Sequence, residues 1–211
     1  AAEEPEVDDL ITLLVAMGAR IERASEDSRS IQIQGVSTLS GVRHRVLPDR
    51  NEAVTFAVAA AVTRGDLLLT DLRVSDLTAF LAKLQKIGVS YERQGKNLRI
   101  WVEEGTVFAP TDVETAPHPG FMTDWQQPIT LLLTQADGDS LIHETVFENR
   151  WEYLSQLKKF GARVALFTPE ELGKPFDHEK ANFDWPKKPP KVFARVSGPA
   201  ALKGAKVTVP D

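Results

Sequence analysis

Three short stretches place a charged residue where a helix is about to begin. In each of them a possible capping residue is followed three positions later by Glu or Gln, which is the capping-box pattern or a close variant. The stretches are Asp49-Arg50-Asn51-Glu52, Thr123-Asp124-Trp125-Gln126 and Asn149-Arg150-Trp151-Glu152. We predict that the first residue of each stretch caps a helix. Capping does not account for the residue in second position.

The residues in second position are Arg50, Asp124 and Arg150. The helix dipole disfavours a cation in the first turn, so the arginines need another reason, such as an anion held against helix N–H groups. A carboxylate there is stabilised as the anion by about 0.3–1 kcal/mol, so we expect Asp124 to be ionised at neutral pH. Such a carboxylate beside an anionic substrate can act as a base. Simple capping by Asp124 is the alternative, and the residues alone leave both open.

The elements that must position these residues repeat along the chain. A helix, a glycine, a strand, a turn and a second strand occur in that order around Gly18, Gly88 and Gly161. Glycine suits the left-handed position that follows a helix. A further helix and strand precede each of the last two copies, as in "NEAVTFAVAAAVTRG" followed by "DLLLTDL". The repeat is therefore predicted to be strand-helix-strand-helix-strand-strand.

This repeat predicts an α+β fold built from βαβαββ units. Two nearly complete units are expected at about 43–102 and 111–196, after a partial unit, and the first of them opens on the basic strand "VRHRV". The segment 168–190 is rich in proline and charge and is predicted to be a surface insertion between two hairpin strands, either solvated or functional. The ending "LKGAKVTVPD" echoes "LSGVRHRVLPD", so both ends cut through a repeat and favour a fragment.

Composition narrows the classes of partner. The 211 residues carry a net charge of -5 with both signs interspersed, which argues against a basic surface for nucleic acid or anionic membrane. There is no cysteine, so disulfides and thiolate metal sites are excluded. No apolar run approaches the ~20 residues that span a bilayer. His118 and His143 are isolated, so we expect no metal site and no cofactor.

Four stretches resemble the UDP-N-acetylglucosamine 1-carboxyvinyltransferases, a family of enolpyruvyl transferases. They are "EPEVDDLITLLVAMGARI", "VLPDRNEAVTFAVAAAVTRG", "TAPHPGFMTDWQQPITLLLTQADGDS" and "ETVFENRWEYLSQLKKFGA". The resemblance covers nearly all of the chain except 168–190. It implies two similar domains, each of three βαβαββ units in an inside-out, barrel-like arrangement. Residues 1–36 would then close the first domain, and 37–211 would hold two units of the second and the start of its third.

The resemblance also implies a reaction. Enolpyruvyl transferases of this kind move the enolpyruvyl group of phosphoenolpyruvate to the 3-hydroxyl of UDP-N-acetylglucosamine, through a tetrahedral intermediate, in the cytoplasm and for peptidoglycan synthesis. Asp124 in "MTDWQQ" matches the residue that takes the hydroxyl proton. Arg150 in "FENR" matches an arginine that contacts the substrate or its phosphate. Val146 and Phe147 match contacts to the nucleotide sugar, with Thr123 and His118 near the same pocket.

Asp211 in "VPD" matches a family acid, and Asp49 and Arg50 are expected at the domain junction. Pro128 cannot donate an N–H to the carbonyl of Asp124, so the turn there is expected to be tight or bent. The general-acid loop and the phosphoenolpyruvate-binding cations of the family's first domain are absent, so the isolated chain is expected to be inactive and prone to self-association. A non-catalytic module binding a nucleotide sugar or a protein, and a shikimate-type transferase, remain alternatives.

Overall fold

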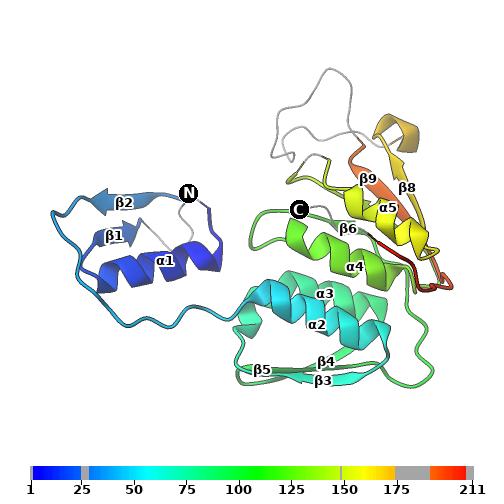
Figure 1. The fold of residues 1–211 in the computed structure, drawn as a ribbon, viewed down its shortest axis with the longest axis horizontal. Coiled ribbons are helices and arrows are strands. Elements are labelled where there is room, and N and C mark those ends of the chain that lie inside the picture. The colour runs from blue at the N-terminus through cyan, green and yellow to red at the C-terminus, as the bar shows by residue number, and fades with distance from the viewer. Residues whose placement is uncertain (1, 25–28, 148, 174–190, 208–211) are drawn as a thin grey trace.

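The computed structural model describes residues 2–24, 29–147, 149–173 and 191–207 of the chain. Its strands form three separate sheets with two, three and four strands, and helices pack between and beside them (Figure 1). The predicted α+β class is confirmed. Every strand pair is antiparallel except one, in which β6 runs parallel to β7.

The N-terminal segment is a helix followed by a two-stranded hairpin, namely α1 (Pro5–Ala16), β1 (Arg20–Arg23) and β2 (Ile31–Gln34). Pro5 occupies the first helical position, where its missing N–H costs nothing, and Glu6 and Asp8 complement the helix dipole in the first turn. Gly18 follows the helix with φ +104°, a conformation that glycine adopts without strain. The predicted αββ pattern is therefore present in this part of the chain.

The first repeat lacks the strand predicted at its start. Residues 37–49 are irregular, Val46 is 72% exposed, and the segment crosses from the α1 side of the molecule to α2 (Figure 1). Because this segment has to span that distance, it does not pair with β3. The rest of the repeat follows the prediction as α2 (Arg50–Val62), β3 (Asp66–Leu69), a 3-10 turn (Val74–Leu77), α3 (Thr78–Ile87), β4 (Ser90–Gln94) and β5 (Asn97–Trp101).

The second repeat has all six predicted elements. They are β6 (Val113–Glu114), α4 (Gln126–Leu133) after a 3-10 turn (Thr123–Trp125), β7 (Gly138–His143), α5 (Glu152–Lys159), β8 (Arg163–Phe167) and β9 (Phe193–Gly198). Its sheet order, β6-β7-β9-β8, equals the order β3-β5-β4 of the first repeat with one strand added at the edge. The predicted insertion begins after β8 with a 3-10 turn (Glu170–Leu172), and most of it lies outside the described residues.

The core lies around the helices of the two repeats. Phe80, Leu81 and Leu84 of α3 and Ile129 and Leu132 of α4 are fully buried. Helix α2 is buried along most of its length, as its Ala/Val composition predicts. In Figure 1, α2, α3 and α4 lie together, with one sheet beneath them and the other beside them. Helices inside and sheets outside are the inside-out arrangement that the family resemblance implies.

Candidate functional site

Asp124 lies in the tight 3-10 turn that leads into α4. Pro128 offers no N–H to the Asp124 carbonyl. With its amide oriented to suit its neighbours, the side chain of Gln127 donates to that carbonyl instead, at 3.2 Å. On the inner side, the Trp125 ring is 1% exposed and its Nε1 donates to Asn51 Oδ1 at 2.9 Å. The turn is thus fixed both by a local contact and by packing on α2, and the prediction of a tight turn is confirmed.

Only one of the three predicted helix caps forms. Asp49 Oδ1 accepts from the backbone N–H groups of Asn51 (2.7 Å) and Glu52 (3.1 Å), as predicted. The Thr123 prediction is wrong, because its side chain makes no capping bond: its oxygen accepts from Arg150 Nη1 at 3.2 Å and its hydrogen goes to the buried carboxylate of Glu144 at 3.0 Å. The Asn149 prediction is also wrong, because Asn149 has φ +61° and α5 begins only at Glu152. In the first case Thr123 is itself the first residue of the 3-10 turn and its oxygen accepts from Arg150, and in the second case the left-handed backbone removes the cap geometry.

The Asp124 side chain is paired with Arg150 rather than used as a cap. Arg150 Nη2 donates to Asp124 Oδ1 at 2.5 Å, and its Nη1 donates to Thr123 Oγ1 at 3.2 Å. The Arg150 guanidinium also stacks 5.4 Å from the centre of the Phe147 ring. The two charged side chains are 39% and 29% exposed, so both can still meet a ligand. Arg150 precedes α5, so the dipole argument made for it from the sequence does not apply.

A partly buried tyrosine, Tyr153, links the two helices that begin just after Asp124 and Arg150. Burial raises the pKa of the Tyr153 phenol well above its usual range, against the smaller opposing effect of its contact with Thr130. The phenol therefore stays protonated and lies 2.9 Å from Thr130 Oγ1, whose own hydrogen goes to the carbonyl of Gln126 at 2.6 Å. This chain of bonds ties α5 to α4, and with it Arg150 to the turn that carries Asp124.

Two clefts meet at Asp124. One, of about 420 Å³, is lined by five of the predicted site residues together with residues near α1; the five are His118, Thr123, Asp124, Val146 and Phe147. The other, of about 620 Å³, runs between α1 and the start of α2 and is lined by Asp49, Arg50 and again Asp124. These seven residues and Arg150, which is bound to Asp124, make eight predicted residues that the structure gathers at one junction. Asp211 lies outside the described residues.

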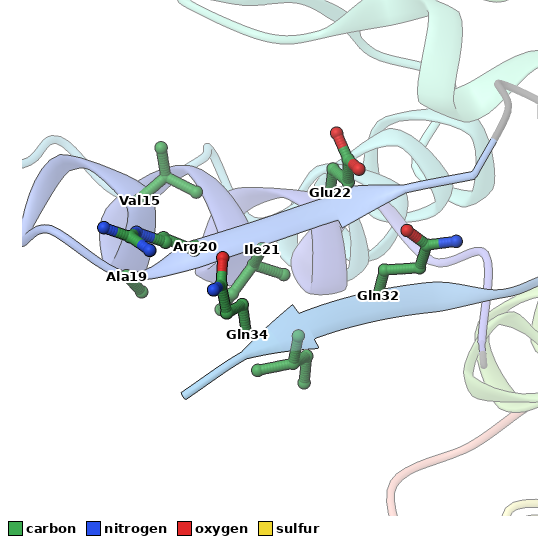
Figure 2. A pocket seen from close by; sticks show the side chains of 8 residues that line it. Val15, Ala19, Arg20, Ile21, Glu22, Gln32 and Gln34 are labelled. Carbon is green, nitrogen blue, oxygen red and sulfur yellow. The ribbon is translucent and has the colours of Figure 1, made fainter. Parts of the chain in front are cut away.

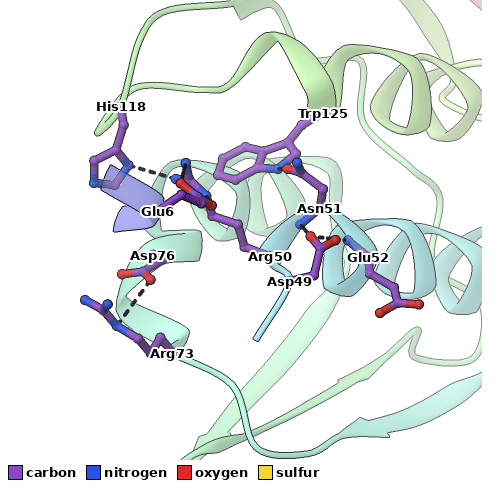
Figure 3. A network of polar contacts seen from close by, with 9 residues as sticks. All are labelled: Glu6, Asp49, Arg50, Asn51, Glu52, Arg73, Asp76, His118 and Trp125. Carbon is purple, nitrogen blue, oxygen red and sulfur yellow. Dashed lines mark hydrogen bonds and ion pairs between the residues drawn. The ribbon is translucent and has the colours of Figure 1, made fainter. Parts of the chain in front are cut away.

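Arg50 is held by a carboxylate of the chain itself. It is 4% exposed, and its Nε and Nη2 each donate to Glu6 of α1 at 2.8 Å (Figure 3). Its Nη1 lies 3.0 Å from His118 Nδ1. Because arginine has only donors, this ring nitrogen accepts and the neutral imidazole carries its proton on Nε2. Arg50 and His118 thus join the N-terminal segment to the repeats, and the anion expected at Arg50 is Glu6.

Sequence reasoning missed Glu4, Glu6 and Glu144. Glu4 lines both clefts, and Glu6 anchors Arg50. Neither role could be predicted from neighbouring positions in the sequence, because both side chains face residues that are far away along the chain. Glu144 did carry a signal, since the alternation of β7 turns Ser140, Ile142 and then Glu144 toward the buried side.

Another cavity, of about 520 Å³, lies on the hairpin β1–β2 (Figure 2). It is lined by Val15, Ile21, Ile33 and other residues that include none of the predicted site. It is the incompletely covered side of a small sheet, where Ile33 is 69% exposed, so we place the functional site at Asp124. Among the described residues, no group of three His, Cys, Asp or Glu side chains is arranged to hold a metal ion. In the same ranges, every helix is too short or too polar to cross a bilayer.

Comparison with known proteins matches this chain to one family. The family model of EPSP synthase (3-phosphoshikimate 1-carboxyvinyltransferase) aligns with residues 1–173. The chain belongs to the EPSP synthase family. Within that family, it is 46% identical over 166 residues to the UDP-N-acetylglucosamine 1-carboxyvinyltransferase of Magnetococcus marinus, an alignment covering 79% of the chain and 39% of the relative. It is 40% identical over its full 211 residues to the enzyme of that name from Agrobacterium fabrum, covering 43% of the relative.

These relatives confirm the resemblance found in the sequence motifs. The chain spans about two fifths of the length of these EPSP synthase family members, 39% and 43%. Among solved structures, the enolpyruvyl transferase NikO from Streptomyces tendae superposes with a TM-score of 0.70 at 24% identity, over 93% of this chain and 41% of that one. At that identity the comparison supports the fold alone, and it agrees with the repeated units described above.

Proposed function

We propose that the protein to which this chain belongs transfers the enolpyruvyl group of phosphoenolpyruvate to the 3-hydroxyl of UDP-N-acetylglucosamine. The observation that carries the proposal is the half-exposed Asp124 carboxylate, held by Arg150 where two clefts meet. Relatives 40–46% identical to this chain bear the name of that activity. As the motif resemblance implies, the reaction would serve peptidoglycan synthesis in the cytoplasm and need no cofactor.

Asp124 is suited to remove the proton from the sugar hydroxyl. Its Oδ1 is occupied by Arg150, and its Oδ2 accepts no hydrogen bond from any described residue. A hydroxyl placed at Oδ2 would lose its proton to the carboxylate while its oxygen bonds to C2 of phosphoenolpyruvate. The methylene carbon then takes a proton from a general acid outside this chain, giving the tetrahedral intermediate. Loss of phosphate from C2 and of a proton from the methyl carbon then forms the enol ether of the product.

The other predicted residues receive roles that follow their positions. Val146 and Phe147 form a wall of the 420 Å³ cleft and would contact the nucleotide sugar, with Thr123 and His118 beside them. Arg150, next to Asp124, would also meet the phosphate of a substrate. Asp49 and Arg50 line the second cleft, where Arg50 is bound to Glu6. We propose that they govern how the N-terminal segment seats on the repeats. Asp211 remains a prediction.

The finer predictions on partners also belong to this proposal. We propose that the two substrates are the partners and that the protein has no nucleic-acid or membrane partner. The exposed apolar side chains of the hairpin, such as Ile33, support self-association of the isolated chain, which light scattering tests. This chain alone is expected to show no turnover with both substrates, because it lacks the general acid that the resemblance implies.

The test is an acceptor panel with the full-length protein. Phosphate release from phosphoenolpyruvate is measured with UDP-N-acetylglucosamine, with shikimate 3-phosphate and with no acceptor. Release that depends on the nucleotide sugar supports the proposal. Release only with shikimate 3-phosphate would assign the acceptor suggested by the family model's name. Calorimetric binding of the nucleotide sugar without any turnover would favour a binding module.

A further inference from the structure

Glu144 is a carboxylate in the interior, directly after β7. Its exposed fraction is 0%, and no cation pairs with it among the described residues. A buried carboxylate is costly unless hydrogen bonds compensate it. Glu144 is compensated by five donors. Its Oε1 accepts from Thr115 Oγ1 (2.9 Å) and from the N–H groups of Val146 (2.8 Å) and Phe147 (3.0 Å). Its Oε2 accepts from Thr123 Oγ1 (3.0 Å) and from Gln126 Nε2.

These donors come from three separate parts of the site. Thr115 follows β6, Thr123 and Gln126 belong to the turn that carries Asp124, and Val146 and Phe147 form the wall of the cleft. One side chain therefore holds the base-bearing turn and the opposite wall at a fixed separation. Since an ionised carboxylate has only acceptors, each of the five contacts has a set direction.

The direction of the bond from Thr123 to Glu144 also determines how Arg150 is bound. The Thr123 hydroxyl gives its only hydrogen to Glu144, so its lone pairs face Arg150 Nη1 at 3.2 Å. Arg150 then presents Nη2 to Asp124. The backbone N–H of Phe147 donates to Glu144, and the ring of the same residue stacks on the Arg150 guanidinium. Two routes thus connect Glu144 to Arg150, and Arg150 holds the carboxylate of Asp124.

We propose that Glu144 is a positioning residue. It sets the direction of the Thr123 hydroxyl and the course of residues 145–147, and through them it places Arg150 and Asp124. The expected effect on kcat rests on the proposed function. The effect of Glu144 on the positions of its neighbours can be measured without any enzymatic activity. Glu144 does not line either cleft, so it acts through its neighbours and not on the substrate.

The decisive variant is Glu144→Gln in the full-length protein. The new amide keeps an oxygen for the two backbone N–H groups and turns its NH₂ toward Thr123 and Gln126. Gln126 Oε1 is buried without a partner among the described residues, so rotating that amide supplies an acceptor and the variant is expected to fold. The Thr123 hydroxyl now accepts from residue 144 and from Arg150, and its hydrogen is released toward the cleft. A misplacement of about 1 Å lowers rates about 100-fold, and we expect kcat to fall by about that factor.

Thr123→Val and the double variant establish the route. Thr123→Val removes the hydroxyl link and leaves the bonds to Val146 and Phe147, so it should lower kcat with little change in KM for the nucleotide sugar. Glu144→Gln should lower kcat and also raise that KM. Because the two residues act in series, the double variant should match Glu144→Gln alone in kcat. Effects on kcat that multiply, or a Glu144→Gln protein with kcat within twofold of wild type, would overturn the proposal.

Two further measurements keep the inference separate from the proposed function. If Glu144→Gln does not fold, an unchanged kcat in Thr123→Val still refutes it. If the wild-type protein transfers no enolpyruvyl group, nuclear magnetic resonance of the 211-residue chain decides the structural part. The amide protons of Val146 and Phe147 should shift in Glu144→Gln and stay in place in the control Glu92→Gln, since Glu92 is exposed on β4 and its carboxylate accepts from Gln94. Unshifted amides in Glu144→Gln would contradict the proposal.

Discussion

Trp125 connects the site to the core, and replacing it with alanine should be strongly destabilising. Its ring is 1% exposed and packs edge-to-face on Phe80 and Phe121, with ring centres 5.9 and 5.5 Å away. Truncating a fully buried tryptophan to alanine costs about 3–5 kcal/mol, which includes the cavity that remains. The lost Nε1 bond to Asn51 and the cation–π contact with Arg50, at 5.9 Å, add about 1 kcal/mol. We therefore expect the free energy of unfolding to fall by about 4–6 kcal/mol.

In a domain of this size, such a loss lowers the melting temperature by about 8–24 °C. The assay is urea unfolding followed by far-ultraviolet circular dichroism, because removing one of the four tryptophans changes the fluorescence signal itself. Trp101→Ala is the matched control, since Trp101 is only partly buried at the end of β5 and its Nε1 donates to exposed Glu103. That variant should lose less than half as much. Equal losses in the two variants would refute the claim that the turn carrying Asp124 is anchored through Trp125.

Two further outcomes are expected. Glu6→Gln removes the charge that holds buried Arg50. Since the Glu6 side chain is 57% exposed, the ion pair is partly screened by solvent, and we expect its loss to weaken the contact between α1 and the repeats by about 1 kcal/mol. The fraction of molecules with the α1 segment detached should then rise about fivefold. Energy transfer between dyes on single cysteines introduced into α1 and β4 of this cysteine-free chain measures the detached fraction. No rise relative to the control Glu22→Gln would contradict the role of the Glu6–Arg50 pair in holding α1. Separately, the hydrogen bond from Arg99 lowers the pKa of Asp66 from its ordinary value of 3.8. The Asp66–Arg99 pair therefore stabilises the folded state fully above pH 3.8, and this stabilisation is lost as the pH falls through the lower pKa of the folded state. Asp66→Asn should therefore lose less stability than wild type on acidification below about pH 4, and equal urea midpoint shifts would argue against the pair.

Local signals in the sequence predicted most of the fold. The glycines at 18, 88 and 161 all have φ near +100° at the ends of helices, because only glycine adopts that conformation freely. Apolar spacing and alternation identified the repeat, since burial of one face imposes them. The strand expected at 42–46 failed because a strand also needs a neighbour, and the path of the chain between α1 and α2 removes it. Helix and strand propensity cannot encode that constraint.

The site was predictable in its residues but not in its contacts. His118, Thr123, Asp124, Val146 and Phe147 do line one cleft, as the motifs suggested. Their partners are set by long-range packing. The Thr123 hydroxyl bonds to Arg150 and Glu144 instead of capping a helix, and Arg50 is paired with Glu6, 44 positions earlier. Such pairs depend on the assembled fold, so no local pattern reveals them.

The central claim is that Asp124 takes the proton of the sugar hydroxyl, and Asp124→Asn in the full-length protein tests it most directly. The amide keeps the size of the side chain and still offers an oxygen to Arg150, so the nucleotide sugar should bind with nearly unchanged affinity by calorimetry. Loss of a general base should lower kcat by about 100- to 10,000-fold. Asp139→Asn, on an exposed position of β7, is the control and should leave kcat unchanged. A kcat for Asp124→Asn close to that of wild type would contradict the account.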